Sequence, residues 1–278
     1  MFATGEIFSY FRCRACGCLQ ISEIPADLSR YYPKDYYSYR RGQASGPRAR
    51  LRRLRNRGLL TGGLNPAGLL ARLQPFEALA ALKPLALAQN ARILDVGCGQ
   101  GQLVRALQEL GYASAIGIDP FLEQDLNPWI RACELRTLSA EQDLIMFHHS
   151  LEHLADPAQA LHDAVRLLAP QGRILIRVPT VDSWAFEHYG DCWVQWDPPR
   201  HLYLLSRGNL ELLASGQGLR VRALWDDSTA FQFWGSESYR HGLPLAEAKR
   251  QFHPWYALRA AQLNHQGRGD QIVCLLSR

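Results

Sequence analysis

From residue 91 onward, short apolar runs alternate with segments of helical spacing, and this alternation restricts the fold more than any other feature. Four runs are β-branched or wholly apolar: "ARILDV", "SAIGID", "DLIMFH" and "GRILIRVP". Helical segments such as "QLVRALQELG" and "DPAQALHDAVRLLAPQG" lie between them, the second expected to start at Asp156 and stop at "PQG". Continuous apolar strands alternating with helices indicate a parallel sheet covered on both faces. The sequence therefore predicts a doubly wound α/β domain.

The composition fits one such domain with appendages. The chain has 278 residues, 47% of them apolar and 21% charged, which is enough to bury a full core. No apolar run approaches the roughly 18 residues of a membrane span, and the first residues lack the pattern of a signal peptide. The seven cysteines are scattered apart from one cluster and form no disulfide framework. We therefore expect a cytoplasmic protein with reduced thiols.

The chain divides into three predicted parts. Residues 1–40 carry the cysteine cluster, as a truncated zinc-ribbon-like segment, and an aromatic string that we expect to pack this appendage on the following domain. Residues 41–90 are a basic linker with Leu/Ala-rich lead-in helices, broken by prolines. Residues 91–278 form the α/β domain, with a helical insertion at about 228–266 before the last, antiparallel strand.

The net charge of +5 comes from one stretch, "RRGQASGPRARLRRLRNR", residues 40–57, which holds eight arginines and no acid. Outside it, the remaining 23 of the 31 basic residues face 26 acidic ones, so the rest of the chain is mildly acidic. Such a run is a nucleic-acid patch, a contact with acidic lipid or a solvated linker helix. Because glycine and proline surround it, we interpret it as a linker.

Three glycines follow the first apolar run, and an acid ends the second. The glycines are Gly97, Gly99 and Gly101. They lie at the first strand-to-helix turn, where ligands bind in open parallel sheets. A dinucleotide fingerprint would need a glycine at position 102, where the chain has glutamine. Asp95, just before the turn, suits a positively charged group better than a phosphate, and Asp119 is placed to accept both hydroxyls of a ribose. We predict a ligand with a ribose at one end and a cation at the other.

The motifs "LDVGCGQG" and "GIDP" resemble those of class I S-adenosylmethionine (SAM)-dependent methyltransferases, and the resemblance covers residues 91–225. It implies a Rossmann-like, mostly parallel seven-stranded sheet with an antiparallel last strand, and SAM as the cofactor. By the pattern of the family, the methionine end of SAM would be held by Asp95, Gly97, Gly99 and Gly101, and its ribose by Asp119. The adenine-contacting region, "LRTLSAEQ", is short here and offers Ser139 and Glu141.

The segment "FHHSLEHLADP" follows the fourth strand, where the family places substrate and methyl donor side by side. It also spells H-x-x-E-H, but the inverted zinc-protease motif needs a long helix in an unrelated fold and a third ligand, so we reject that interpretation. We expect positions 149, 152 and 153 to share one helical face. His149 is our first candidate for the base that deprotonates an acceptor hydroxyl. Glu152 and His153 are either further catalytic residues or structural ones.

The segment "YGDCWVQWDPPRHLYLLS", residues 189–206, holds more aromatic and polar side chains than a connector needs. We expect it to form part of the acceptor wall. Its second half resembles a segment in methyltransferases of the ubiquinone-pathway type, in which Arg200 and His201 would face the active site. His201 is thus a catalytic candidate, and the substrate-binding candidates are Asp197, Arg200 and Tyr203. A buried structural pair is the alternative.

Two later segments, "DDSTAFQFWGSESYRHGLP" and "LNHQGRGDQIVCLL", resemble a subgroup of bacterial methyltransferases associated with surface-polysaccharide assembly. Between them, Pro244 to His265 reads as one helix, which we expect to cover the acceptor pocket as a lid. Trp234, Tyr239 and Arg240 either stack on and hydrogen-bond a sugar or belong to an ordinary aromatic core.

The N-terminal segment "YFRCRACGCLQISEIP" has C-x-x-C followed by glycine, the spacing of half a zinc ribbon. Cys13 and Cys16 are the predicted metal ligands. A structural zinc takes four ligands, and Cys18 would join only with strained geometry. Relatives in the resembling subgroup carry another cysteine pair upstream, so Met1 is either an internal or misassigned start or the start of a truncated segment. For zinc, the second predicted cofactor, the sequence therefore supplies only half of a four-ligand site.

Our main hypothesis is a SAM-dependent methyltransferase that acts on a hydroxyl of a small molecule or a glycan. The second hypothesis is a nucleic-acid-binding protein that uses the cysteines and the arginine run, which predicts salt-sensitive binding. The confinement of basic residues to one run argues against it. The third hypothesis is a relative that binds the cofactor without chemistry.

Overall fold

The computed structural model describes residues 6–32, 46–63, 65–73, 76–250 and 253–278. It divides the chain into two compact units. Unit 1 comprises Met1–Tyr32, Leu151–Leu161 and Ile176–Ser277, and unit 2 comprises Pro33–Ser150, His162–Leu175 and Arg278. Met1, most of the predicted aromatic string and the first arginines of the basic run lie outside the described residues.

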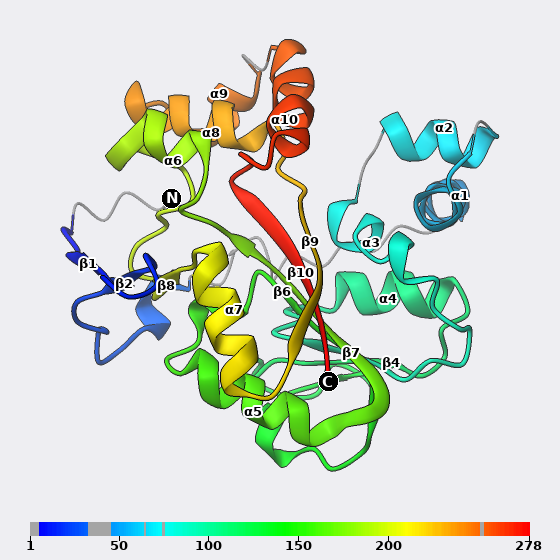
Figure 1. Cartoon of the computed structure of the whole chain (residues 1–278). Coiled ribbons are helices and arrows are strands. Elements are labelled where there is room, and N and C mark those ends of the chain that lie inside the picture. Colours follow the sequence, from blue (N-terminus) through cyan, green and yellow to red (C-terminus); the bar gives the residue numbers. More distant parts are fainter. Residues whose placement is uncertain (1–5, 33–45, 64, 74–75, 251–252) are drawn as a thin grey trace. The chain divides into compact units, whose positions relative to one another are not determined.

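Seven strands form one sheet. Their bounds are β3 Ile93–Val96, β4 Ala115–Ile118, β5 Ile130–Arg131, β6 Gln142–His148, β7 Leu168–Pro179, β9 Arg220–Asp226 and β10 Gln271–Ser277. The order across the sheet is β5-β4-β3-β6-β7-β10-β9 (Figure 1). β3 is parallel to β4 and β6, and β4 is parallel to β5, whereas β10 is antiparallel to β9. The predicted mostly parallel seven-stranded sheet with an antiparallel last strand is confirmed.

The central strands are buried over most of their length. All four residues of β3 are buried, and so is the stretch Leu144 to Phe147 of β6. Strands covered on both faces cannot alternate apolar and polar residues, which is why they read as continuous apolar runs in the sequence. Asp95 is the charged exception within β3, and its position needs a functional explanation.

The helix predicted from Asp156 ends earlier than expected. α5 spans Pro157–Leu167, and β7 begins directly afterwards, so that Pro170 lies within the strand. The predicted cap is confirmed, because the Asp156 carboxylate accepts a hydrogen bond from the backbone N–H of Gln159 at 2.9 Å. A proline disfavours helical backbone for the residue before it, so the helix stops ahead of Pro170 rather than at the glycine of "PQG".

Unit 2 contains a group of helices before and beside the glycine turn. They are α1 Gly46–Thr61, α2 Pro66–Leu73, α3 Glu77–Ala80 and α4 Gln102–Glu109, with the short 3-10 helices η3 Lys83–Leu85 and η4 Leu135–Thr137. The arginines from residue 48 onward lie in α1, which packs against α2 (cyan in Figure 1). A β-carbon on Gly58 would lie 2.0 Å from the carbonyl oxygen of Ala67, so glycine permits this close approach. The basic run is therefore largely part of a packed helix pair.

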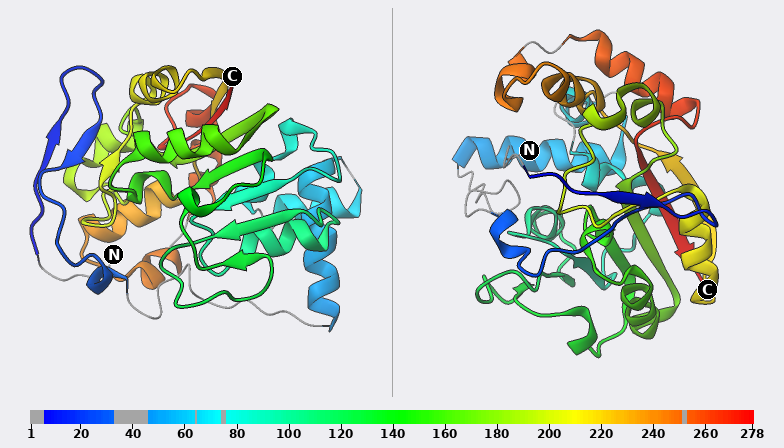
Figure 2. Two further views of the ribbon diagram at one scale, coloured as in Figure 1. Left: turned by 90° about the horizontal axis from the view of Figure 1, so that it is seen from below. Right: turned by 90° about the vertical axis from the view of Figure 1, so that its left-hand side faces the viewer.

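Unit 1 contains a small second sheet and most of the later helices. β1 Tyr10–Arg12 and β2 Leu19–Ile21 form an antiparallel hairpin, and β8 Tyr203–Leu204 pairs with β2 (Figures 1 and 2). The helices are η1 Ser29–Tyr31, η5 Leu151–His153, α6 Trp184–Tyr189, η6 Gly190–Cys192, α7 Arg207–Gly216, α8 Phe231–Arg240, α9 Leu245–Arg250 and α10 Trp255–His265. The cysteine segment is thus joined to the chain around residue 203 through backbone pairing.

The single helix predicted from Pro244 to His265 is instead two helices, α9 and α10. Pro254 is the N-cap residue of α10. Proline lacks a backbone N–H and clashes with a preceding helical turn, which explains why one helix does not run through this position. α10 and α8 contact each other within unit 1, and Phe233 of α8 stacks on Tyr256 of α10. Every described helix is too short or too polar to span a membrane.

Candidate functional site

The glycine turn joins β3 to α4 at the point where the strand order reverses, since β3 lies between β4 and β6. All three predicted glycines have positive φ: 75° at Gly97, 53° at Gly99 and 73° at Gly101. For other residues such angles cost about 1–2 kcal/mol. Gly101 is also the N-cap of α4, whose first backbone N–H groups lack helical partners. The turn therefore offers donors and close backbone approach to a ligand.

Two carboxylates flank this turn, and both are buried. Asp95 is 4% exposed and Asp119 is 7% exposed. Asp119 accepts hydrogen bonds from the backbone N–H groups of Gly99 and Phe121, each at 2.9 Å. Burial raises the pKa of Asp95 to about 8, and the charge of Asp119 adds to the increase. Burial also raises the pKa of Asp119, although the two N–H groups act in the opposite direction.

Within the described part of the chain, no ion pair involves Asp95 or Asp119. Buried carboxylates are normally paired with a cation or bound to a metal, because an isolated buried charge is costly. Two of them side by side therefore favour a ligand that brings positive charge and hydroxyl donors. The two acids and the three glycines expected from the sequence therefore lie together at this turn.

Ser150 closes one side of the glycine turn and was missed by the sequence analysis. Its hydroxyl donates to the carbonyl oxygen of Val96 at 2.6 Å, tying the residue after β6 to the end of β3. A β-carbon on Gly97 would lie 2.5 Å from the Ser150 Cβ. A serine next to the conspicuous histidines of "FHHSLEH" carries no signal of its own, so only the packing against Gly97 reveals it.

The predicted adenine contacts are exposed. Ser139 and Glu141 both lie on the surface, and Glu141 pairs with Arg92 at 3.5 Å. Phe121, two residues after Asp119, is 53% exposed, and its backbone N–H is already bound to the Asp119 carboxylate. An exposed aromatic ring next to Asp119, the predicted ribose contact, suits stacking on a base. The adenine role of Glu141 stays a prediction, and Phe121 is a further candidate.

The expectation that positions 149, 152 and 153 share one helical face was wrong. His149 has a positive φ of 50° and precedes η5, which contains only Leu151 to His153. A left-handed residue cannot belong to a right-handed helical turn, so His149 points independently of the other two. His149 is half-buried at the end of β6, within unit 2. Its role as a base stays a prediction.

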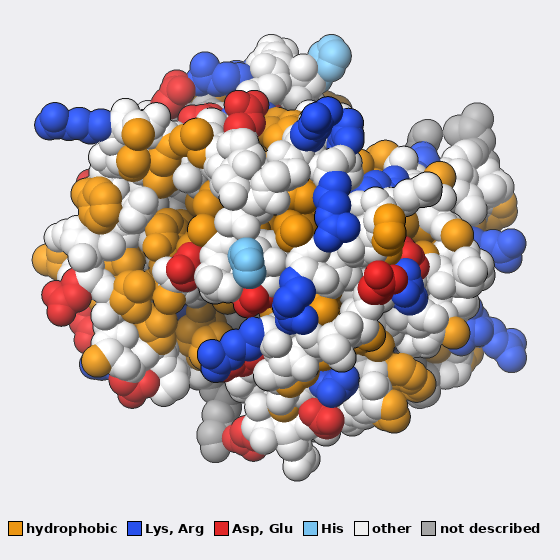
Figure 3. Space-filling view, turned by 60° about the horizontal axis from the view of Figure 1, so that its bottom comes forward, with side chains coloured by type: hydrophobic (Ala, Val, Ile, Leu, Met, Phe, Trp, Pro, Cys, Tyr) orange, Lys and Arg blue, Asp and Glu red, His pale blue; other side chains and the backbone are white. Residues whose placement is uncertain are grey.

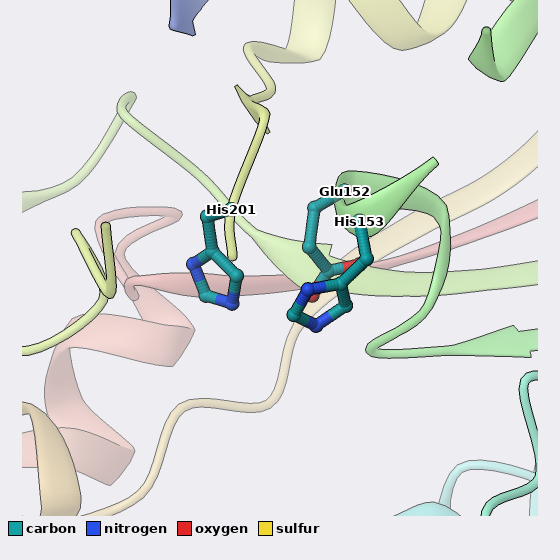
Figure 4. Close-up of side chains that lie close together, drawn as sticks. All are labelled: Glu152, His153 and His201. Carbon is teal, nitrogen blue, oxygen red and sulfur yellow. The ribbon is translucent and has the colours of Figure 1, made fainter. Parts of the chain in front are cut away.

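Glu152, His153 and His201 gather in unit 1, although His201 comes from a distant part of the chain (Figure 4). Glu152 is fully buried and His201 is 5% exposed. The two imidazole rings meet edge to face with centroids 4.8 Å apart. Burial lowers the pKa of His153 to about 4, and His201 contributes in the same direction. His153 is therefore neutral at physiological pH.

Backbone carbonyls orient both rings. Nδ1 of His153 lies 2.8 Å from the carbonyl oxygen of Arg200, and Nδ1 of His201 lies 2.7 Å from that of Gln195. The Tyr32 hydroxyl lies 3.3 Å from the same nitrogen of His153. Three of the four catalytic candidates, Glu152, His153 and His201, thus lie together, a grouping that the sequence did not predict, and each ring is fixed at one nitrogen.

Asp197 and Arg200 form a buried ion pair, each 3% exposed. Arg200 also donates to the carbonyl oxygen of Tyr31 at 2.9 Å. Burial by itself would raise the pKa of Asp197, but His201 and Arg200 outweigh it and lower the pKa. The alternative in the sequence analysis was a buried structural pair of Arg200 and His201; both side chains are buried, but the ion-pair partner of Arg200 is Asp197. Tyr203, in β8, donates its hydroxyl to the carbonyl oxygen of Ala155 at 3.1 Å. Substrate contacts by these residues stay predictions.

Trp234, Tyr239 and Arg240 lie in α8 among other aromatic residues. The Trp234 ring is 4.6 Å from that of Phe231, and the Arg240 guanidinium lies 4.6 Å from the ring centre of Tyr189. Burial raises the pKa of Tyr239, and nearby Asp197 adds to the increase. These contacts match an ordinary aromatic core, so a sugar contact by Trp234 stays a prediction.

Comparison with known families decides the class of the domain. Residues 70–224, more than half of the chain, match the family described as a methyltransferase domain. The chain belongs to this methyltransferase family. The match covers β3 to β6, the glycine turn and both buried carboxylates. The predicted membership among class I SAM-dependent methyltransferases is confirmed at the level of the family. The polysaccharide subgroup stays a prediction.

Curated relatives of this methyltransferase carry the name ubiquinone biosynthesis O-methyltransferase. The protein from Xylella fastidiosa (strain 9a5c) is 34% identical over 124 residues, covering 37% of this chain and 50% of the relative. That from Caulobacter sp. (strain K31) is 30% identical over 128 residues, covering 40% and 51%. The chain thus spans about half the length of the curated relatives it matches.

Solved structures of methyltransferases share the fold. Coclaurine N-methyltransferase bound to N-methylheliamine and SAH aligns with a TM-score of 0.51 at 12% identity, covering 92% of this chain and 84% of that one. A likeness at this identity shows the fold alone.

The cysteine segment of the methyltransferase brings two thiols together. The sulfur atoms of Cys16 and Cys18 are 3.3 Å apart, and the backbone N–H of Cys13 donates to the carbonyl oxygen of Cys18 at 2.9 Å. Burial raises the pKa of Cys18 to about 11, whereas backbone N–H groups lower the pKa of the half-buried Cys13. Zinc binding by Cys13 and Cys16 stays a prediction.

The distribution of basic side chains on the surface is relevant to the hypothesis of a nucleic-acid-binding protein. On the face shown in Figure 3, basic side chains lie among acidic ones rather than in one continuous patch. In α1, Arg52 is bound to Glu109 of α4 at 2.5 Å. Nucleic-acid binding needs several basic groups that can neutralise successive phosphates. Arg48, Arg50, Arg53 and Arg57 of the same helix are exposed, so the nucleic-acid alternative stays a hypothesis.

Replacing Gly97 by alanine is expected to lower both the melting temperature and the affinity for SAM. The new β-carbon adds the cost of positive φ, about 1–2 kcal/mol, to a clash with Ser150. Gly218→Ala is a matched control, because Gly218 has a φ of 69° but nothing within 4 Å of an added β-carbon. Thermal unfolding and calorimetric titration compare the two variants. Equal losses in both would show that Ser150 does not confine the turn.

Proposed function

We propose that this methyltransferase transfers a methyl group from SAM to a hydroxyl group of a small-molecule acceptor. The observation that carries the proposal is the pair of buried carboxylates, Asp95 and Asp119, beside a turn of three positive-φ glycines. A ligand with a cationic methionine end and a ribose supplies the partners that this pair requires. The names of the curated relatives support oxygen as the acceptor atom.

The residues at the turn fit such a ligand. Each oxygen of Asp119 accepts one backbone N–H, and a carboxylate oxygen has a second lone pair that can accept a ribose hydroxyl. Asp95 would ionise opposite the cationic methionine end. Gly97 and Gly99 leave room for a close approach to the backbone.

When bound, SAM supplies the methyl group of its sulfonium. His149 remains our candidate for the base: it would take the hydroxyl proton as the acceptor oxygen bonds to the methyl carbon and a neutral thioether leaves. His153 is less suited to this task, because its pKa lies near 4 and its Nδ1 is bound to a carbonyl oxygen. Most of the rate acceleration would come from positioning.

A glycan hydroxyl as acceptor, and a role in surface-polysaccharide assembly, remain predictions from the resemblance of two segments. The described part of the predicted lid, Pro244 to His265, lies in and around α9 and α10 of unit 1, and its role as a lid stays a proposal. Sugar nucleotides are therefore included beside phenols in the acceptor screen.

Calorimetric titration with SAM tests the proposal. Asp119→Ala is expected to weaken SAM binding at least about a hundredfold, because two hydrogen bonds to a charged group, at about 1.5–3 kcal/mol each, are lost. Asp191→Ala, at an exposed aspartate, is the control and should bind like the wild type. Well-folded wild-type protein that does not bind SAM would overturn the proposal. Methyl transfer to phenols and sugar nucleotides then identifies the acceptor.

A further inference from the structure

The cluster of Glu152, His153 and His201 has the composition of a metal site. Each residue offers one ligand atom, and these atoms all lie within 4.8 Å of one another (Figure 4). The three residues come from η5 and from the segment before β8, all within unit 1. Ligand bonds of about 2.0–2.2 Å bring tetrahedral ligand atoms to roughly 3.4 Å from each other. Small side-chain rotations would therefore close the site around an ion.

The hydrogen bonds of the two histidines prepare them as ligands. A carbonyl oxygen only accepts, so Nδ1 of His153 and Nδ1 of His201 each carry their proton toward a carbonyl, of Arg200 and Gln195 respectively. In a neutral ring this leaves Nε2 with a free lone pair. Metal-bound histidines almost always donate their other N–H to a carbonyl or carboxylate, which fixes the tautomer and the ring orientation. Tyr32 can share the His153 proton as a second acceptor.

The neighbouring charges do not compete for the same ion. Asp197 is bound to Arg200 in the buried ion pair, so its carboxylate is already neutralised. The fully buried Glu152 is thus the carboxylate that the cluster itself contributes. Two imidazoles with one carboxylate form a ligand set for zinc, manganese or iron(II), and three protein ligands leave positions open for oxygen atoms.

We infer that Glu152, His153 and His201 bind one divalent transition-metal ion through a carboxylate oxygen and two Nε2 atoms. The site differs from the rejected H-x-x-E-H interpretation, because His201 takes the place of His149 and no long helix is needed. Metal binding at this cluster does not depend on the proposed function.

Titration of the full chain with Mn²⁺ tests the inference, after removal of bound metals by EDTA. Electron paramagnetic resonance follows the free aqua ion, whose signal is lost on binding. Mn²⁺ prefers oxygen and nitrogen ligands, so the thiols of the cysteine segment do not compete. We expect one saturable site per chain. Absence of saturable binding by the wild type would overturn the inference.

Two variants locate the ion. Glu152→Gln removes the carboxylate at constant size, and His201→Asn keeps a donor near the Nδ1 position toward Gln195 while it removes Nε2. Each should lower the Mn²⁺ affinity at least about tenfold, since even residues that only orient a ligand affect affinity tenfold to a hundredfold. His162→Asn, at an exposed histidine of α5, is the matched control and should bind like the wild type. Unchanged binding in both site variants would refute the assignment.

Folding and SAM binding are measured on the same samples. Circular dichroism verifies the fold, and if the buried substitution Glu152→Gln does not fold, His153→Asn replaces it, because its amide can still donate to the carbonyl of Arg200. Calorimetry with SAM separates this inference from the proposed function. Mn²⁺ binding without SAM binding would leave the metal site intact and remove the methyl-transfer proposal, and the reverse result would remove only the metal site.

Discussion

Asp95→Asn is expected to stabilise the ligand-free protein while it abolishes tight SAM binding. The pKa of Asp95 is raised from 3.8 to about 8, so between these values the folded state holds a proton that the unfolded state releases. The free energy of unfolding therefore falls as the pH rises from about 4 to 8. Asparagine removes this penalty, which is about 2–4 kcal/mol at pH 7. Urea unfolding at pH 4 and pH 7 should show a gain only at the higher pH.

SAM binding by the wild type should depend on pH in the same range. A cationic ligand needs Asp95 ionised, so affinity should rise by up to about tenfold per pH unit from pH 6 to 7.5. Above about pH 8 the α-amino group of the ligand loses its own proton. Asp95→Asn should bind weakly and without this dependence. A pH-independent affinity of the wild type would mean that Asp95 does not face the cation.

Asp143→Asn is a control for which we expect the opposite effect on stability. Asp143 lies in β6, and its pKa is lowered by hydrogen bonds from Arg92. Its substitution should therefore destabilise the protein slightly at neutral pH, with no effect on SAM binding. A destabilising effect of Asp95→Asn as well would show that the protein itself satisfies the Asp95 carboxylate, and the argument for a cationic ligand would fail.

Arg200→Met is expected to destabilise the protein by about 3–5 kcal/mol, because it leaves Asp197 charged and buried without its partner. Adding Asp197→Asn should recover a large part of this loss, since asparagine carries no charge and tolerates the positive φ of 39° at this position. Denaturant unfolding of the two single variants and the double variant gives the coupling energy.

The exposed pair of Arg268 and Glu187 is the matched control for this ion pair. Their nitrogen and oxygen atoms are 2.7 Å apart, but both side chains are largely exposed. Arg268→Met should therefore cost less than about 1 kcal/mol. If Arg200→Met cost no more than this and instead weakened acceptor turnover alone, Arg200 would be a substrate residue rather than a structural one.

The local sequence pattern was sufficient to predict the sheet and the glycine turn. Burial on both faces demands continuous apolar strands, and the turn after β3 demands glycines with positive φ, so both leave a trace in consecutive residues. Helix boundaries that depend on a single proline were less predictable. Pro170 shortened α5, and Pro254 divided the helix predicted from residue 244 into two.

The chain alone determined the strands, the glycine turn and the acids that flank it, because these follow from the conformational preferences of neighbouring residues. Only the tertiary structure decided where the histidines lie. It separated His149 from Glu152 and His153 through one left-handed residue, and it brought His201 to them from a distant segment. Contacts of this kind depend on how packed elements meet, and residue spacing along a chain carries no record of them.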